Sequence, residues 1–207
     1  DTTAKTKKAL ILDVRTQKDY IESHIPGSIF IGLNGSFAPW VGTLISNIKQ
    51  PLLLVVPEGR SEEAITRLAR VGYDNTLGYL NGGINTWIKS GRKYDQLTSI
   101  SPFELEKLSK QKTLSVLDVR KEGEYDTMHL KLDGLQHLSL DQINHRLDQI
   151  DTQKTYYIHC AGGYRSMIAA SILKSRGIHN LIDVIGGYTA IKEAGIPVSD
   201  YVCPSTL

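Results

Sequence analysis

"LDVRTQKDYIESHI", residues 12–25, recurs later in the chain as "LDVRKEGEYDTMHL", residues 117–130. Asp13 corresponds to Asp118 and His24 to His129, each pair 105 positions apart. The correspondence continues downstream: Arg60-Ser61 matches Arg165-Ser166 at the same spacing, and Gly82-Gly83 matches Gly186-Gly187 at 104. A unit of about 100 residues, a size that can bury its own core, is therefore present twice.

Each copy alternates short apolar runs with helical patterns. The runs "ALILDV", "PLLLVV", "LSVLDV" and "TYYIHC" suit strands buried on both faces. "SEEAITRLARVG" and "SMIAASILKSRG" have helical spacing and end at glycine. "LGYL" and "LIDVI" are further strands, each followed by a Gly-Gly pair and a short helix. This order predicts two α/β domains, 1–95 and 96–207, each with a mainly parallel central sheet flanked by helices.

The junction between the copies is predicted at "GRKYDQLT", residues 91–98. "SPFELEKL" follows, with Ser101 as helix cap, Pro102 at the first helical position and Glu104 at the capping-box position. We therefore expect a helix to begin at Pro102.

The composition narrows the function. The 207 residues are 41% hydrophobic and 22% charged, with a net charge of +2 and no basic run, so no nucleic-acid partner is expected. No apolar run approaches the roughly 20 residues needed to span a bilayer, so no membrane partner is expected either. The two cysteines, Cys160 and Cys203, form no disulfide framework. A cytoplasmic location is the default expectation.

Residues 158–166, "IHCAGGYRS", place Cys160 at the carboxyl end of a predicted central strand, just before a helix. Ligands of open α/β sheets bind at such ends. Two glycines let the loop curl and aim backbone N–H groups inward. With the helix N-terminus and the Arg165 guanidinium, these groups should bind an anion and stabilise a nucleophilic Cys160 thiolate. The alternative is a small core cysteine beside a tight turn.

The run from Cys160 to Ser166 resembles the C-x-x-G-x-R-S active-site loop of the rhodanese superfamily. Both copies also carry the family's first signature, the "LDVR" segments, and its Gly-Gly pair. The resemblance implies a tandem rhodanese that transfers sulfur in two steps. Cys160 takes a sulfane sulfur from a small-molecule donor as a persulfide, and a thiol or other nucleophilic acceptor removes it. No metal or organic cofactor is needed. The implied site is catalytic Cys160 and Arg165, with Ala161, Gly162, Gly163, Tyr164 and Ser166 binding substrate through the loop.

Two other functions remain open. A phosphatase or an arsenate reductase is the first alternative; phosphatases of similar fold use His-Cys-x5-Arg, whereas only four residues separate Cys160 from Arg165. A non-catalytic persulfide carrier or docking module is the second alternative. An isolated catalyst would move many sulfurs per Cys160, whereas a carrier would stop at one without its partner.

The first copy departs from the pattern at the nucleophile. Aligning Arg60 on Arg165 puts Val55 opposite Cys160. Pro57 removes an amide donor, and Glu58 adds negative charge. We expect a catalytically silent first domain with a structural or docking role; a different ligand site at Arg60 is the alternative.

The resemblance also bears on substrate and partners. Rhodaneses that favour thiosulfate often carry lysine two residues after the cysteine, where this chain has Gly162. A low-molecular-weight thiol persulfide is then the more attractive donor or product. The stretches "FAPWVGTLI", residues 37–45, and "EGRSEEAITRLARVGYDNTLGYLNGGINTW", residues 58–87, are similar to the inactive rhodanese unit of fusions headed by a metallo-β-lactamase-like persulfide dioxygenase. We expect the chain to be the C-terminal part of such a fusion, whose iron would lie in the other domain.

Several other residues have structural interpretations. Asp118 and Arg120 are expected to pair and brace the site. His24 and His129 recur in both copies, which favours a structural hydrogen bond over a catalytic base. His159 neighbours the nucleophile, but successive strand residues point to opposite faces. Cys203, in the C-terminal segment, is either a resolving thiol or, more simply, a bystander.

Overall fold

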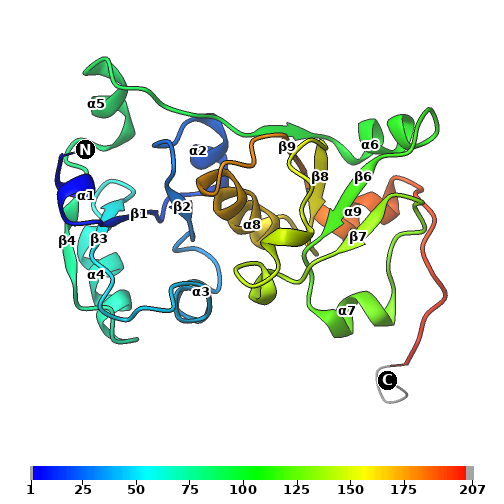
Figure 1. The fold of residues 1–207 in the computed structure, drawn as a ribbon, viewed down its shortest axis with the longest axis horizontal. Helices are drawn as coiled ribbons and strands as arrows, with labels where there is room; N and C mark the ends of the chain where they lie inside the picture. Colours follow the sequence, from blue (N-terminus) through cyan, green and yellow to red (C-terminus); the bar gives the residue numbers. More distant parts are fainter. Residues whose placement is uncertain (1, 204–207) are drawn as a thin grey trace. The chain divides into compact units, whose positions relative to one another are not determined.

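The structure, a computed structural model, describes residues 2–203. The chain divides into two compact units, Asp1–Leu97 and Thr98–Leu207, drawn in Figure 1. Each unit is an α/β domain with a parallel sheet flanked by helices, which confirms the predicted fold class.

The first unit has the sheet order β2-β1-β3-β4, with every pair parallel. Its elements are α1 (Thr2–Thr6), β1 (Leu10–Asp13), α2 (Gln17–Glu22), β2 (Ile29–Phe30), α3 (Phe37–Leu44), β3 (Leu52–Val55), α4 (Ser61–Ala69), β4 (Thr76–Tyr79) and α5 (Gly83–Lys89). The central strands β1 and β3 come from the apolar runs "ALILDV" and "PLLLVV". Leu12 and Leu54, register partners on these two strands, are fully or almost fully buried.

The second unit has the order β5-β9-β8-β6-β7, again all parallel. Its elements are β5 (Thr98–Ile100), α6 (Pro102–Ser109), β6 (Ser115–Asp118), α7 (Glu122–Thr127), β7 (Leu135–His137), the 3-10 helices η1 (Leu140–Gln142) and η2 (Leu147–Gln149), β8 (Tyr156–His159), α8 (Tyr164–Ser175), β9 (Leu181–Val184) and α9 (Gly187–Glu193).

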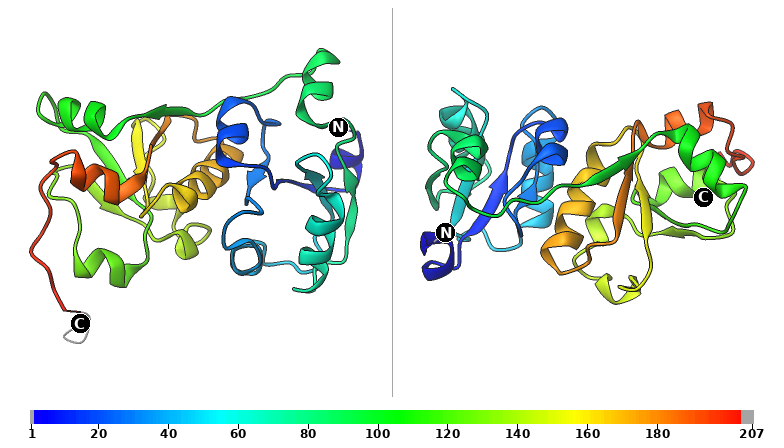
Figure 2. Two further views of the ribbon diagram at one scale, coloured as in Figure 1. Left: turned by 180° about the vertical axis from the view of Figure 1, so that it is seen from behind. Right: turned by 90° about the horizontal axis from the view of Figure 1, so that it is seen from above.

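Two features of the second unit matter for the site. The capping box of Ser101 and Glu104 is present, so α6 begins at Pro102 as expected. Figure 2 shows α8 on one side of the strands and α6 and α9 on the other. Helix α8 is buried along most of its length, from Ser166 to Leu173. The segment that joins β8 to α8, residues 160–163, therefore lies between a central strand and a buried helix.

The two sheets differ at one edge. Strand β5 pairs with β9 in the second unit, but residues 2–97 contain no counterpart of it on β4. None of the described helices is long and apolar enough to cross a membrane.

Candidate active site

Cys160 is the first residue after β8 and is 1% exposed. The Gly163 backbone N–H donates to Cys160 Sγ at 3.1 Å. Gly163 can curl back in this way because it is left-handed, with φ of 99°, and α8 begins immediately after it. The sulfur therefore faces a backbone donor at the N-terminus of a twelve-residue helix, which favours an anionic sulfur.

The loop carbonyls are held away from the sulfur by α9. The Tyr188 N–H donates to the Cys160 carbonyl at 2.6 Å, and the Thr189 N–H donates to the Ala161 carbonyl at 3.2 Å. This close approach requires Gly187, which has a φ of 60°; a Cβ there would lie 2.3 Å from the Cys160 carbonyl oxygen. The second Gly-Gly pair thus fixes the orientation of the catalytic loop.

Ser166 lies beneath the sulfur in the first turn of α8 and is fully buried. Its Oγ is 3.8 Å from Cys160 Sγ, 2.9 Å from the Gly163 carbonyl oxygen and 2.7 Å from Asp183 Oδ1. Asp183, on β9, is 4% exposed. Burial raises the pKa of Asp183 to about 6, although the Ser166 hydrogen bond opposes the rise.

Arg165 makes a bidentate ion pair with Glu124 of α7. Its Nη1 and Nη2 lie 2.5 and 2.8 Å from the two carboxylate oxygens. The pair lowers the pKa of Glu124 and raises that of Arg165. The guanidinium charge is thus largely balanced before any anion arrives, so the backbone amide and helix terminus supply most of the local positive potential.

The predicted pair of Asp118 and Arg120 is present and buried. Arg120 Nε lies 3.0 and 2.9 Å from the two Asp118 oxygens, and Arg120 Nη2 also donates to the Met128 carbonyl at 2.9 Å. The guanidinium carbon lies 4.0 Å from the centroid of the Tyr188 ring. The Tyr188 backbone N–H also donates to the Cys160 carbonyl. The ion pair of Asp118 and Arg120 therefore supports the loop through its contact with Tyr188.

His159 is fully buried, and burial lowers its pKa, so the ring is neutral at neutral pH. Its Nδ1 lies 3.4 Å from the Cys160 carbonyl oxygen and its Nε2 lies 3.9 Å from Asp118 Oδ2. The two ring nitrogens therefore lie near the Cys160 carbonyl and the Asp118 carboxylate.

The two repeated histidines have the structural role that was expected. Nδ1 of His24 is 2.7 Å from the Tyr20 carbonyl oxygen, and Nδ1 of His129 is 3.0 Å from that of Tyr125. Each ring stacks on the tyrosine four positions earlier. Cys203 is exposed, and its part as resolving thiol or bystander stays a prediction.

The first unit requires a correction to the predicted alignment. The Val14 N–H donates to the Val55 carbonyl, as the Val119 N–H donates to the His159 carbonyl, and Asp13 pairs in register with Val55 as Asp118 does with His159. Val55 therefore corresponds to His159, and Val56 takes the place of Cys160. The alignment on arginine was wrong because three residues separate Val56 from Arg60, whereas four separate Cys160 from Arg165. In either alignment, a valine occupies the position that corresponds to Cys160.

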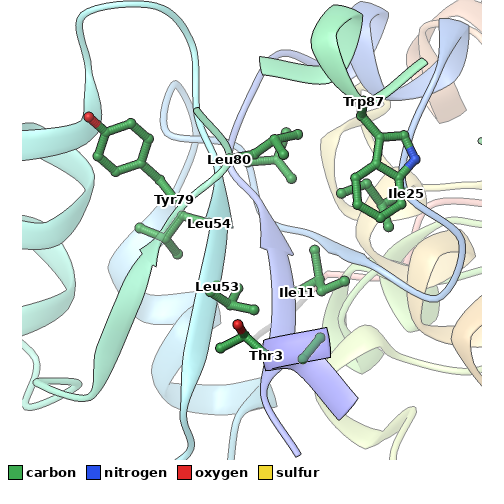
Figure 3. Close-up of a pocket in the computed structure, with 10 residues that line it drawn as sticks. Thr3, Ile11, Ile25, Leu53, Leu54, Tyr79, Leu80 and Trp87 are labelled. Carbon is green, nitrogen blue, oxygen red and sulfur yellow. The ribbon is translucent and has the colours of Figure 1, made fainter. Parts of the chain in front are cut away.

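Two of the cavities in the described residues lie in the first unit. One, of about 670 Å³, opens over the loop that follows β3 and is lined by Val56, Glu58, Asp19 and Asn81 among others. The second, of about 170 Å³, is shown in Figure 3, with Trp87 of α5 beside Ile25 and with Ile11 and Leu53 on the strands. Its lining is mostly apolar, with hydroxyl groups on Thr3 and Tyr79.

Two site residues, Glu124 and Asp183, were not identified from the sequence. Glu124 stands where the first copy has Asp19, so a recurring acid was the available signal. Asp183 was visible as one carboxylate inside the apolar run "LIDVI". Buried carboxylates are rare without a partner, which made that residue conspicuous.

The chain is similar in sequence to proteins with sulfur-related names. The chain is 31% identical over 97 residues to a Bacillus subtilis protein named putative sulfur carrier protein YrkF, a match covering 45% of this chain and 51% of that protein. The chain thus spans about half the length of this relative. It is 29% identical over 107 residues to Coxiella burnetii thiosulfate sulfurtransferase GlpE, covering 52% of this chain and 94% of the relative.

A crystal structure of a rhodanese-like domain protein from Staphylococcus aureus is also similar. Its identity is 30% and its TM-score 0.44, over 50% of this chain and all of that one. The family model described as rhodanese-like domain matches residues 2–90 and again residues 101–194. The chain therefore belongs to the rhodanese-like domain family and carries two of its domains in tandem.

Proposed function

We propose that the chain is a sulfurtransferase that carries sulfane sulfur on Cys160. The thiolate attacks the terminal sulfur of a donor R–S–SH. The donor S–S bond breaks, R–SH leaves with the proton, and Cys160 holds the anion Cys–S–S⁻. A nucleophilic acceptor then attacks the outer sulfur, and Cys160 leaves as the thiolate.

The observation that carries this proposal is the polarity of the loop. The Gly163 N–H points at the sulfur, while α9 holds the carbonyls of Cys160 and Ala161. A preorganised donor of this kind stabilises charge that develops on sulfur during transfer. Cys160 and Arg165 are the proposed catalytic residues, with the loop residues Ala161, Gly162, Gly163, Tyr164 and Ser166 binding substrate and Asp118 and Arg120 supporting it.

The charge balance favours a low-molecular-weight thiol persulfide over thiosulfate as donor. Thiosulfate is a dianion, and here Arg165 is paired with Glu124 while the position two after the nucleophile is Gly162. Thiosulfate stays a candidate donor because the Coxiella relative is named a thiosulfate sulfurtransferase. The same ion pair argues against a phosphatase or arsenate reductase, which needs its loop arginine for a multiply charged oxyanion.

The first unit is proposed to be catalytically silent. Val56 stands in the place of the nucleophile, Pro57 has no N–H, and the Glu58 carboxylate lines the cavity over the loop. Its proposed role is docking, with a fused or partner persulfide dioxygenase as the source of the sulfur. The proposed location is cytoplasmic.

The test is the intact mass of the chain after exposure to thiosulfate or, separately, to glutathione persulfide. The native chain should gain one sulfur, and Cys160→Ser should gain none. Cys203→Ser is the matched control, because it removes the other thiol and should still load. Loading of Cys160→Ser, or no loading of the native chain by either donor, would refute the proposal.

A sulfur carrier is the second candidate, favoured by the name of the Bacillus relative. Turnover separates the two. With excess donor and a thiol acceptor, a catalyst releases many sulfurs per chain, whereas a carrier stops after one.

A further inference from the structure

The Ser166 hydroxyl has one proton and three neighbours. The Gly163 carbonyl and an ionised Asp183 carboxylate can only accept that proton, and so can an anionic Cys160 sulfur. Because all three lie within 2.7 to 3.8 Å of Oγ, they compete for it. A protonated Asp183 instead donates to Ser166 Oγ. The hydroxyl proton is then available to the Gly163 carbonyl or to the Cys160 sulfur.

We infer that Asp183 is a positioning residue, which sets whether the Ser166 hydroxyl donates to the Cys160 sulfur or turns away from it. With Asp183 neutral, Asp183 donates to Ser166, and Ser166 can donate to the thiolate or to the persulfide anion. With Asp183 ionised, the shorter bond to the carboxylate holds the hydroxyl proton, and a second negative charge lies behind the sulfur. The inference deepens the proposed function and takes its chemical meaning from it.

The surroundings of Asp183 are consistent with a carboxyl that changes state near neutral pH. On the strands beside it, its register partners are Ser99 of β5 and Ile158 of β8, and α8 presents Ser166. None of these side chains is charged, and the titratable group beyond Ser166 is the Cys160 thiol itself. The buried Ser99 hydroxyl has no hydrogen-bond partner within the described chain. The loop cation Arg165 is paired with Glu124.

The shift in the Asp183 pKa, to about 6, places its titration where it can matter. Below that pH, neutral Asp183 donates to the Ser166 hydroxyl, which donates to the Cys160 sulfur. Above that pH, the Ser166 hydroxyl donates to the Asp183 carboxylate instead. The device would make the sulfur anion better stabilised in mildly acidic solution than the loop amide alone allows.

The test is a titration of the Cys160 thiolate by its ultraviolet absorbance, in a Cys203→Ser background with Cys160→Ser subtracted. Asp183→Asn keeps the shape and removes the charge, and Asp183→Ser is a second neutral variant. In either variant the thiolate should form about one pH unit lower, which is a tenfold higher thiolate fraction well below the midpoint. Adding Ser166→Ala should abolish most of that shift.

Either of two results would overturn the inference. One is a midpoint that both neutral variants leave unchanged. The other is an equal shift with and without the Ser166 hydroxyl, which would show direct charge repulsion instead of hydroxyl positioning. The titration needs no sulfur donor, so it is independent of the mass test above. A clear shift in a chain that never loads sulfur would sustain the hydroxyl switch and refute sulfur transfer.

Discussion

Gly187→Ala should uncouple α9 from the catalytic loop. The added Cβ would lie 2.3 Å from the Cys160 carbonyl oxygen and 2.9 Å from Ala161 atoms, whereas ordinary contact begins at 3.4 Å. Backbone on one side must therefore move by about 1.1 Å. That movement weakens the Tyr188 N–H bond to the same carbonyl, which is 2.6 Å long in the native chain.

The expected cost has two parts. A left-handed alanine costs about 1–2 kcal/mol, and a weakened buried hydrogen bond about 1 kcal/mol more. We expect Gly187→Ala to destabilise the second unit by roughly 2–4 kcal/mol with the steric term included. A reacting group misplaced by about 1 Å can lose roughly 100-fold in rate, so sulfur loading should slow by that order.

Gly177→Ala is the matched control. Gly177 is also left-handed, with φ of 87°, but its added Cβ would meet nothing within 4 Å. It should cost about 1–2 kcal/mol and leave the loading rate unchanged.

Urea unfolding by circular dichroism and sulfur loading by intact mass measure the two effects. The chain's two tryptophans, Trp40 and Trp87, both lie in the first unit, so their fluorescence provides an internal reference for the unaffected unit. Equal stability and equal loading rates for Gly187→Ala and Gly177→Ala would refute the role assigned to the close approach.

Three further outcomes are expected. Asp118→Asn leaves the charge of its buried arginine partner uncompensated and should lower the unfolding free energy of the second unit by about 3–5 kcal/mol. The matched Asp13→Asn should have the same effect on the first unit. The unfolding midpoint measured by tryptophan fluorescence should shift only for Asp13→Asn. Burial raises the pKa of Asp183 above its ordinary 3.8 to about 6, so its stabilising contribution is complete below pH 4 and is lost as pH rises through 6. The unfolding free energy of the native chain relative to Asp183→Asn should therefore fall by roughly 3 kcal/mol over that window, and urea titrations that show no such fall would contradict it. Glu124→Gln frees the Arg165 charge and should raise the loading rate from thiosulfate several-fold more than that from a thiol persulfide, whereas equal changes for both donors would count against the charge argument.

The sequence predicted the central elements because their patterns are long enough to be distinctive. The runs "PLLLVV" and "TYYIHC" became β3 and β8, and the capping box at Ser101 started α6. The edge strands β2, β5 and β7 were not predicted. They are two or three residues long, too short to show alternation, and are defined only by their parallel partners.

The candidate site divides in the same way. The loop from Cys160 to Ser166 is local, so its spacing and glycines could be interpreted directly. The contacts of Arg165 with Glu124 and of Ser166 with Asp183 cross 41 and 17 positions. No local pattern records which acid meets which loop residue, because that depends on how the sheet brings α7 and β9 to the loop.

The two copies show why a strand and a helix alone do not make this site. Strands β1 and β3 pair in the same register as β6 and β8, and each loop contains a left-handed glycine, Gly59 in the first unit and Gly163 in the second. In the second unit α8 starts directly after that glycine, whereas α4 starts two residues after Gly59, at Ser61. Five residues therefore separate β3 from α4, whereas four separate β8 from α8, and the first unit's loop includes a proline that lacks an N–H. A cysteine at position 56 would therefore have neither the same curl of backbone donors nor the same distance to the helix terminus. The two loops therefore differ in backbone geometry and in N–H donors as well as in the residue at the position of Cys160.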